Sequence, residues 1–160
     1  MKELISKCYI AVCFILLSVP ATMAQGYQFD FASAGLTMTI PNNWVTSEHI
    51  LLLMMPKAED LTIEAEVLNT NDLSEAVELS SLELKSVFPT DTSFVVDDIV
   101  INRMPVKKID KISGSEQLIY YILKTPEDKI VKIHCKAPKK MITKYKNDLT
   151  KLIQSIKPKE

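Results

Sequence analysis

Glycine is scarce in this chain, with only 3 residues among 160. Loops that cradle phosphate groups need several glycines, because the backbone amides must approach the ligand closely. The sequence contains neither such a loop nor the Gly-x-Ser-x-Gly pattern of a serine hydrolase. These absences exclude two common kinds of nucleotide-binding or catalytic motif, and we expect no bound cofactor.

Cysteine is equally scarce, and two of the three cysteines, Cys8 and Cys13, lie close to the N-terminus. Cys135 is the only other thiol, so we expect no internal disulfide in a processed chain. No Cys-x-x-Cys or His-x-His spacing is present, so the sequence predicts no zinc site. Three acidic residues could suggest a calcium site: Asp91, Asp97 and Asp98. The glycine-bearing pattern of a calcium-binding loop is absent, so we interpret them as residues of solvent-exposed turns.

Arginine occurs once, as Arg103, among 19 basic residues. Recognition of planar phosphates and bases usually relies on arginine, so we expect no nucleic-acid partner. Beyond the N-terminal segment no run of apolar residues is long enough to span a bilayer as a helix, so we expect no transmembrane segment.

Charge is spread unevenly along the chain. Residues 25–102 hold 13 acidic and 2 basic residues, whereas residues 103–160 hold 6 acidic and 15 basic residues. Such asymmetry can indicate a polyanion-binding half. We expect instead that the two halves interleave in one sheet and offset each other. The predicted cross-strand partners of Glu64 and Glu66 are Lys107, Lys132 or Lys136.

Residues 1–24 show the features of a secretory signal peptide in their usual order. A positive start is followed by the apolar run Cys8–Val19, which is too short to cross a bilayer about 30 Å thick. Thr22-Met23-Ala24 supplies small residues for cleavage, so we expect the mature chain to begin at Gln25. Neither early cysteine follows a lipoprotein-type run, so we expect no lipid anchor. The sequence predicts a periplasmic or secreted protein.

The stretch Gln117–Ala137 predicts the central hairpin of a single domain that spans residues 25–160. Two segments rich in β-branched and aromatic residues, Leu118–Lys124 and Ile130–Cys135, flank a polar turn. The first segment is apolar on both faces, which is typical of a strand covered on both sides. We therefore expect a sheet with helices packed on both of its faces.

The remaining elements follow from periodicity and turn residues. A helix is predicted to begin at Asp72, which has the capping-box spacing to Glu75, and to end before Phe88. A second helix is predicted from Pro138 to about Ile156. The run Ile50–Met55 predicts a buried strand or, with one face uncovered, a Met-rich groove for a partner. Asp97-Asp98 is predicted as a turn, and further strands are predicted at Tyr27–Ala32, Leu36–Ile40, Leu61–Val67, Thr92–Val96, Ile99–Asn102 and Val106–Ile112.

His134 and Cys135 are adjacent in the sequence and have the chemistry of a base and a nucleophile. Neighbouring residues on a strand point to opposite faces. We therefore expect Cys135 to lie in the core and His134 on the surface. The alternative is a small enzyme or metal-dependent module that uses these two residues or surface carboxylates.

Four motifs occur in a fixed order along the chain: the aromatic opening strand Tyr27–Phe31, the run Thr39-Ile40-Pro41-Asn42-Asn43-Trp44, Ile101-Asn102 before a turn, and Ile153–Ile156 closing a terminal helix. Their order resembles that of the PsbP-like superfamily over essentially the whole mature chain. The resemblance implies an α+β fold in which an antiparallel β-sheet lies between helices, an α/β/α sandwich. It also implies a non-catalytic protein that binds partners. Plant members attach to photosystem II, a nuclear member binds the Ran GTPase, and bacterial members include periplasmic proteins and effector chaperones.

The chain differs from many relatives in two turns. Those relatives have Asp-Gly where this chain has Asn42-Asn43, and Gly where this chain has Arg103. Trp44 follows the first turn and either locks it against the sheet, which we expect, or anchors a partner. The candidate partner-binding residues are Asn42, Asn43, Trp44 and Arg103. The predicted function is that of an exported binding or accessory protein with an unknown protein partner, not that of an enzyme.

Overall fold

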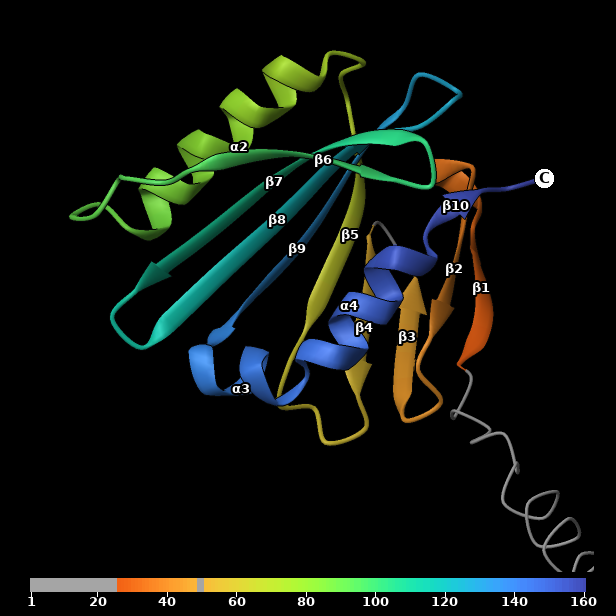
Figure 1. Ribbon diagram of the computed structural model, residues 1–160, viewed down its shortest axis with the longest axis horizontal. Coiled ribbons are helices and arrows are strands. Elements are labelled where there is room, and N and C mark those ends of the chain that lie inside the picture. The colour runs from red at the N-terminus through yellow and green to blue at the C-terminus, as the bar shows by residue number, and fades with distance from the viewer. Residues whose placement is uncertain (1–25, 49–50) are drawn as a thin grey trace, which may run out of the picture.

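The computed structural model describes residues 26–48 and 51–160. Their main feature is a seven-stranded antiparallel sheet of strand order β3-β4-β5-β9-β8-β7-β6 (Figure 1). The prediction of an α+β fold with an antiparallel sheet is confirmed. The strands are β3 (Trp44–Glu48), β4 (Leu52–Pro56), β5 (Ile63–Leu68), β6 (Val96–Ile101), β7 (Met104–Ser113), β8 (Glu116–Lys124) and β9 (Ile130–Pro138).

The hairpin of β8 and β9 lies inside the sheet, with β5 and β7 on either side. Side chains on both faces of β8 are buried, as its two-sided apolar pattern predicts. Tyr120 and Ile122 belong to one hydrophobic cluster and Ile119 and Leu123 to another. The central hairpin is therefore shared by two cores, one on each face of the sheet.

Helix α2 (Leu73–Val87) covers one face, where Ala76 and Leu84 pack in the cluster that includes Tyr120 (Figure 1). Asp72 caps the helix: its Oδ1 atom accepts hydrogen bonds from the backbone N–H groups of residues 74 and 75, at 2.7 and 3.4 Å. The helix ends at Val87, so both of its predicted ends are confirmed.

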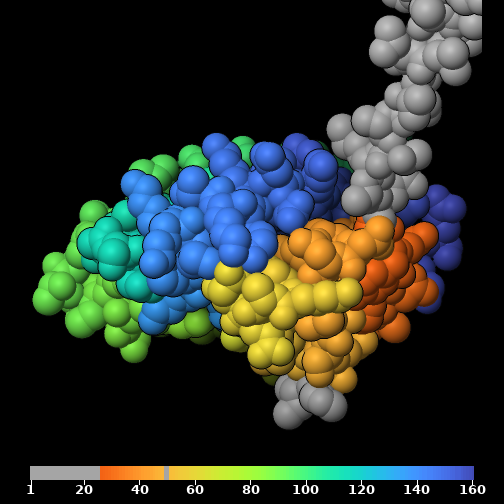
Figure 2. Space-filling view, turned by 90° about the horizontal axis from the view of Figure 1, so that it is seen from below, coloured from red at the N-terminus to blue at the C-terminus, as the bar shows by residue number. Residues whose placement is uncertain are grey.

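The opposite face carries α3 (Lys139–Lys144) and α4 (Lys146–Ser155), which the sequence predicts as one helix. The helix is interrupted at Tyr145, whose φ of −99° and ψ of 11° depart from helical values. The Tyr145 side chain is held by Trp44 and by Asp60, which accepts a 2.7 Å hydrogen bond from its hydroxyl. Figure 2 shows the C-terminal helices in blue beside the β4–β5 connection in yellow.

A second, three-stranded sheet of order β1-β2-β10 extends the fold beyond the single predicted sheet. It contains β1 (Tyr27–Phe31), β2 (Leu36–Ile40) and the two-residue strand β10 (Lys157–Pro158), with the short 3₁₀ helix η1 (Ala32–Ala34) between β1 and β2. A two-residue strand has no sequence period, which is why the prediction missed β10. Gly35, at a φ of 67°, makes the turn into β2.

The prediction of a strand at Thr92–Val96 followed by a turn at Asp97-Asp98 is wrong. Only Val96 of that segment is in a strand, and both aspartates lie inside β6. β6 is an edge strand, so its charged side chains can reach solvent without leaving the sheet.

The predicted strand Ile50–Met55 corresponds to β4, although Ile50 and the neighbouring His49 lie outside the described residues. Leu52 and Met54 are fully buried, whereas Leu53 and Met55 are half-buried on the other face. The predicted signal peptide at residues 1–24 and the start of the domain at residue 25 also lie outside the described part of the chain.

Candidate functional site

The four predicted partner-binding residues do not come together. Asn42 and Asn43 are exposed in the β2–β3 turn, and Arg103 is exposed in the β6–β7 turn. Figure 1 shows these two turns far apart, one at the lower end of β3 and the other beside β10. The binding role of these residues stays a prediction.

Trp44 is 2% exposed, and its ring makes an edge-on contact with Tyr145, with centroids 6.0 Å apart and planes at 88°. Its backbone N–H donates a 2.9 Å hydrogen bond to the carbonyl of Pro41. This is the geometry of a residue that locks the turn against the sheet. Because the indole is buried, the surface of the turn is formed by Asn42 and Asn43.

Asn102 fixes the β6–β7 turn to the C-terminal end of α4. Its Nδ2 atom donates hydrogen bonds to the carbonyls of Gln154, at 3.0 Å, and Ile156, at 2.7 Å. Asn102 and Arg103 have φ values of 46° and 71°, in the left-handed region that a two-residue hairpin turn requires. The motif Ile101-Asn102 therefore has a structural role as a clamp between distant parts of the chain.

We expect Asn102→Gly to lower the free energy of unfolding by about 1–2 kcal/mol, because two carbonyl acceptors lose their donor while glycine keeps the positive φ. Chemical denaturation of the variant and the wild type measures this difference. Asn42→Ala is the control, since this exposed turn residue makes no comparable contact with residues 26–48 and 51–160, and the change should alter stability by less than about 0.5 kcal/mol. Equal effects at the two positions would contradict the clamp.

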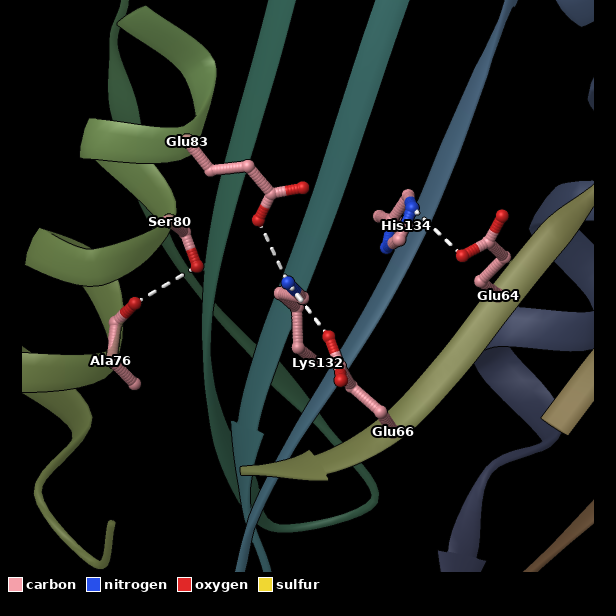
Figure 3. A network of polar contacts seen from close by, with 7 residues as sticks. All are labelled: Glu64, Glu66, Ala76, Ser80, Glu83, Lys132 and His134. Atoms are coloured by element: carbon pink, nitrogen blue, oxygen red, sulfur yellow. Dashed lines mark hydrogen bonds and ion pairs between the residues drawn. The ribbon is translucent and has the colours of Figure 1, made fainter. Parts of the chain in front are cut away.

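A charged network lies between α2 and the sheet (Figure 3). The Lys132 Nζ atom is 2.7 Å from Glu66 Oε1 and 2.8 Å from Glu83 Oε2, and the lysine is only 7% exposed. Glu66 lies directly across from Lys132 in the β5–β9 pair. The predicted pairing of Glu66 with Lys132 is therefore confirmed. Lys132 is buried because α2 covers this part of the sheet.

Interactions within the network stabilise the charged forms of Lys132 and Glu83 against the cost of burial. Burial disfavours the ammonium of Lys132, but hydrogen bonds with Glu66 and Glu83 outweigh burial and raise its pKa. Burial likewise opposes ionisation of Glu83, yet the bonded lysine holds the pKa of this carboxyl below its ordinary value. The charge of Lys132 is thus compensated within the network, and the two carboxylates, which are 35% and 41% exposed, leave it with a net charge of −1.

His134 and Tyr120 form the neighbouring, more apolar part of this face, with ring centroids 5.7 Å apart. His134 Nε2 is 3.4 Å from Glu64 Oε2, which lies opposite it across the strands. Burial lowers the pKa of His134, so its imidazole is neutral near pH 7. Burial, together with the nearby Glu83 charge, raises the pKa of Tyr120. The predicted surface position of His134 is therefore corrected to a half-buried one beside Tyr120, on the face of the sheet that α2 covers.

Lowering the pH from 7.5 to 5.5 should destabilise the protein through His134. Its folded-state pKa lies below the ordinary value of 6.5, so the unfolded chain binds the proton more readily. The stabilising contribution is complete above the unfolded-state pKa of about 6.5 and is lost as the pH falls from there through the lower folded-state pKa. Urea unfolding at several pH values measures the slope. His134→Gln should flatten it between pH 5.5 and 7, and an unchanged slope in this variant would contradict the assignment.

Cys135 lies on the other face of β9 and is 4% exposed. Burial raises the pKa of its thiol to about 12, so the thiolate that acts as a nucleophile is disfavoured. Since His134 points to the opposite face of the sheet, the two residues do not form a nucleophile–base pair. The predicted core position of Cys135 is confirmed.

A surface hollow of about 690 Å³ lies where β8 begins and β9 ends. Its lysines are exposed, so they can contact an acidic surface, but no buried polar side chain among its lining residues orients a ligand. The lining residues are Ser115, Glu116, Pro138, Lys139, Lys140 and Thr143.

Two further properties concern residues 26–48 and 51–160 only. No group of three His, Cys, Asp or Glu side chains among them is arranged to hold a metal ion. No helix within these ranges is long and apolar enough to cross a membrane.

No protein-family model and no curated protein matches the chain, but solved structures do. Cyanobacterial PsbP (CyanoP) from Synechocystis has a TM-score of 0.61 at 8% identity, covering 87% of this chain and 95% of that chain. The Ran-binding protein Mog1p of Saccharomyces cerevisiae has a TM-score of 0.55 at 9% identity, covering 87% of this chain and 97% of that chain.

A structure from Bacteroides thetaiotaomicron matches with a TM-score of 0.58 at 14% identity over 85% of this chain. The match covers 49% of that protein, so this chain spans about half of its length. At such identities the likeness shows the fold alone. This shared fold confirms the resemblance that was inferred from the order of motifs in the sequence.

Proposed function

We propose that this chain, which has the PsbP/Mog1-like fold, is an exported, non-catalytic binding or accessory protein that acts through protein–protein contacts in the cell envelope. The observation that carries the proposal is that the side chains with catalytic potential are paired or buried within the fold. Lys132 is neutralised by two carboxylates, and the Cys135 thiol is buried on the face away from His134. What remains available to a partner is surface shape, sheet edge and exposed charge.

Two further observations support this function. The fold is shared with Mog1p, which binds Ran, so the scaffold can carry a protein-binding surface. The order of charge, apolar run and small residues in residues 1–24 is that of an export signal. The proposal therefore places the partner outside the cytoplasm.

Isolation of the protein from envelope fractions of its native cells tests the proposal. We expect an N-terminus at Gln25 and migration on native gels as part of a complex larger than the free chain, with the partner identified by mass spectrometry. A protein that keeps Met1 and stays with the cytoplasmic fraction would refute export. A protein that migrates only as the free chain would refute the accessory role.

The competing enzyme uses Cys135 as a nucleophile, and thiol labelling separates the two functions. In the native protein we expect Cys135 to react with a maleimide at least about a hundredfold more slowly than the unfolded chain, because burial blocks access and suppresses the thiolate. Labelling is measured by mass spectrometry on the chain from Gln25, which has no other cysteine. Rapid native labelling would favour the enzyme.

A further inference from the structure

β6 is one edge of the seven-stranded sheet, and half of its backbone groups face away from β7. The two-residue turn at Asn102 and Arg103 makes Ile101 and Met104 a hydrogen-bonded pair. In an antiparallel ladder such pairs alternate with pairs that do not bond. Val100 and its partner Pro105 are therefore a non-bonded pair, which fits the missing N–H of proline.

The same alternation turns the backbone N–H and C=O groups of Val96, Asp98 and Val100 toward the outside of the sheet. None of the backbone hydrogen bonds found between described residues outside the ladders uses these groups. The opposite edge differs, because Thr46 of β3 contacts Tyr27 of β1, with 3.2 Å between their hydroxyl oxygens.

The β6 edge carries few of the features that usually prevent pairing, and Asp97 and Asp98 are its only charged residues. Its six residues, Val96–Ile101, contain no lysine, proline or glycine. Val95 is 69% exposed and Val100 is 72% exposed, so apolar side chains accompany the free backbone groups. An added strand would cover these side chains while satisfying the backbone.

Charge determines which kind of strand fits. The segment 88–101 contains three aspartates and no basic residue, and the Asp98 side chain is 78% exposed even though it pairs with Lys107. A second copy paired antiparallel through the same outward residues, 96, 98 and 100, would place Asp98 opposite Asp98, which like-charge repulsion disfavours. A strand with a basic residue opposite Asp98 gains an ion pair instead.

We propose that the β6 edge accepts an extended segment of a partner protein as an additional antiparallel strand, with a lysine or arginine of that segment opposite Asp98. The backbone groups of Val96, Asp98 and Val100 supply the hydrogen bonds, and Asp98 sets the register. This inference rests on the proposed function and specifies its binding surface.

Selection of random twelve-residue peptides displayed on phage against the folded chain from Gln25 tests the inference. Selected peptides should alternate β-branched or aromatic residues with lysine or arginine. Val100→Pro should weaken their binding at least about tenfold, because it removes an outward N–H without breaking a β6–β7 bond. The matched Val100→Thr variant keeps that N–H and should bind as the wild type does.

Asp98→Lys should also weaken binding about tenfold, whereas Glu78→Lys, at an exposed position on α2, should not. Hydrogen exchange gives a second measurement that needs no variant: the amides of Val96, Asp98 and Val100 should exchange rapidly in the free protein and become protected with peptide. Failure to select any peptide, peptides without basic residues, unweakened binding to Val100→Pro, or dimerisation of the wild type through β6 would each overturn the inference.

The two proposals fail separately. If the native envelope complex forms equally well with Val100→Pro, the proposed function stands and the β6 surface is wrong. If peptides bind β6 as expected but the native protein forms no complex in the envelope, the accessory role is wrong.

Discussion

Trp44→Ala should lower the free energy of unfolding by about 3–5 kcal/mol, the range for truncating a buried large aromatic side chain. The indole is 2% exposed and packs edge-on against Tyr145, so its loss leaves a cavity between the β2–β3 turn and the C-terminal helices. Urea unfolding followed by far-ultraviolet circular dichroism measures the change. Trp44 is the only tryptophan, so blue-shifted emission that iodide quenches poorly should report its burial in the wild type.

Two variants control for this prediction. Val45→Ala changes the adjacent residue, which is 41% exposed, and should alter stability by less than about 0.5 kcal/mol. Trp44→Phe should cost less than Trp44→Ala, because it keeps an aromatic contact and removes a buried indole N–H that has no partner among the described residues. A Trp44→Ala variant as stable as the wild type would show that the indole does not support the fold.

Lys132→Met should destabilise the protein by about 2–3 kcal/mol, because it leaves two carboxylates beneath α2 without their cation. This is less than the range of about 3–5 kcal/mol for breaking a fully buried pair, since the side chains of Glu66 and Glu83 remain 35% and 41% exposed and water can solvate them. Thermal and urea unfolding near pH 7 measure the loss. Lowering the pH toward 4 should shrink the difference between variant and wild type, because the Lys132 ammonium lowers the pKa of Glu83 and this stabilisation is lost as Glu83 becomes protonated.

The matched control is Lys159→Met, which breaks the exposed 2.8 Å pair with Asp30 and should change stability by less than about 0.5 kcal/mol. The triple variant Lys132→Met, Glu66→Leu, Glu83→Leu should recover most of the lost stability, since no uncompensated charge remains under the helix. If Lys132→Met and Lys159→Met had equal effects, the buried network would contribute no more than a surface pair.

The sequence by itself determined the elements whose signals are local. Asp72 marks the start of α2 because its side chain caps the first turn, whatever the rest of the chain does. The apolar residues on both faces of β8 required cover on both sides, and alternation along β9 placed Cys135 and His134 on opposite faces. From these features the central hairpin, the inert thiol and the kind of fold could be predicted.

The tertiary structure decided where each face of the sheet meets another element. Lys132 and His134 look like surface residues in an alternating strand. The pairing of β5 with β9 places Glu66 and Glu64 beside them, and α2 covers this face of the sheet and brings Glu83 to Lys132. β6 is an open edge because no other strand among the described residues pairs with its outer side. Asp97 and Asp98 can therefore remain in the strand, since their side chains reach solvent there. β10 exists only because Asn102 and β2 hold the C-terminal segment in place. Periodicity along a chain records which side chains share a face, but the burial and charge of that face depend on contacts with residues far away in sequence.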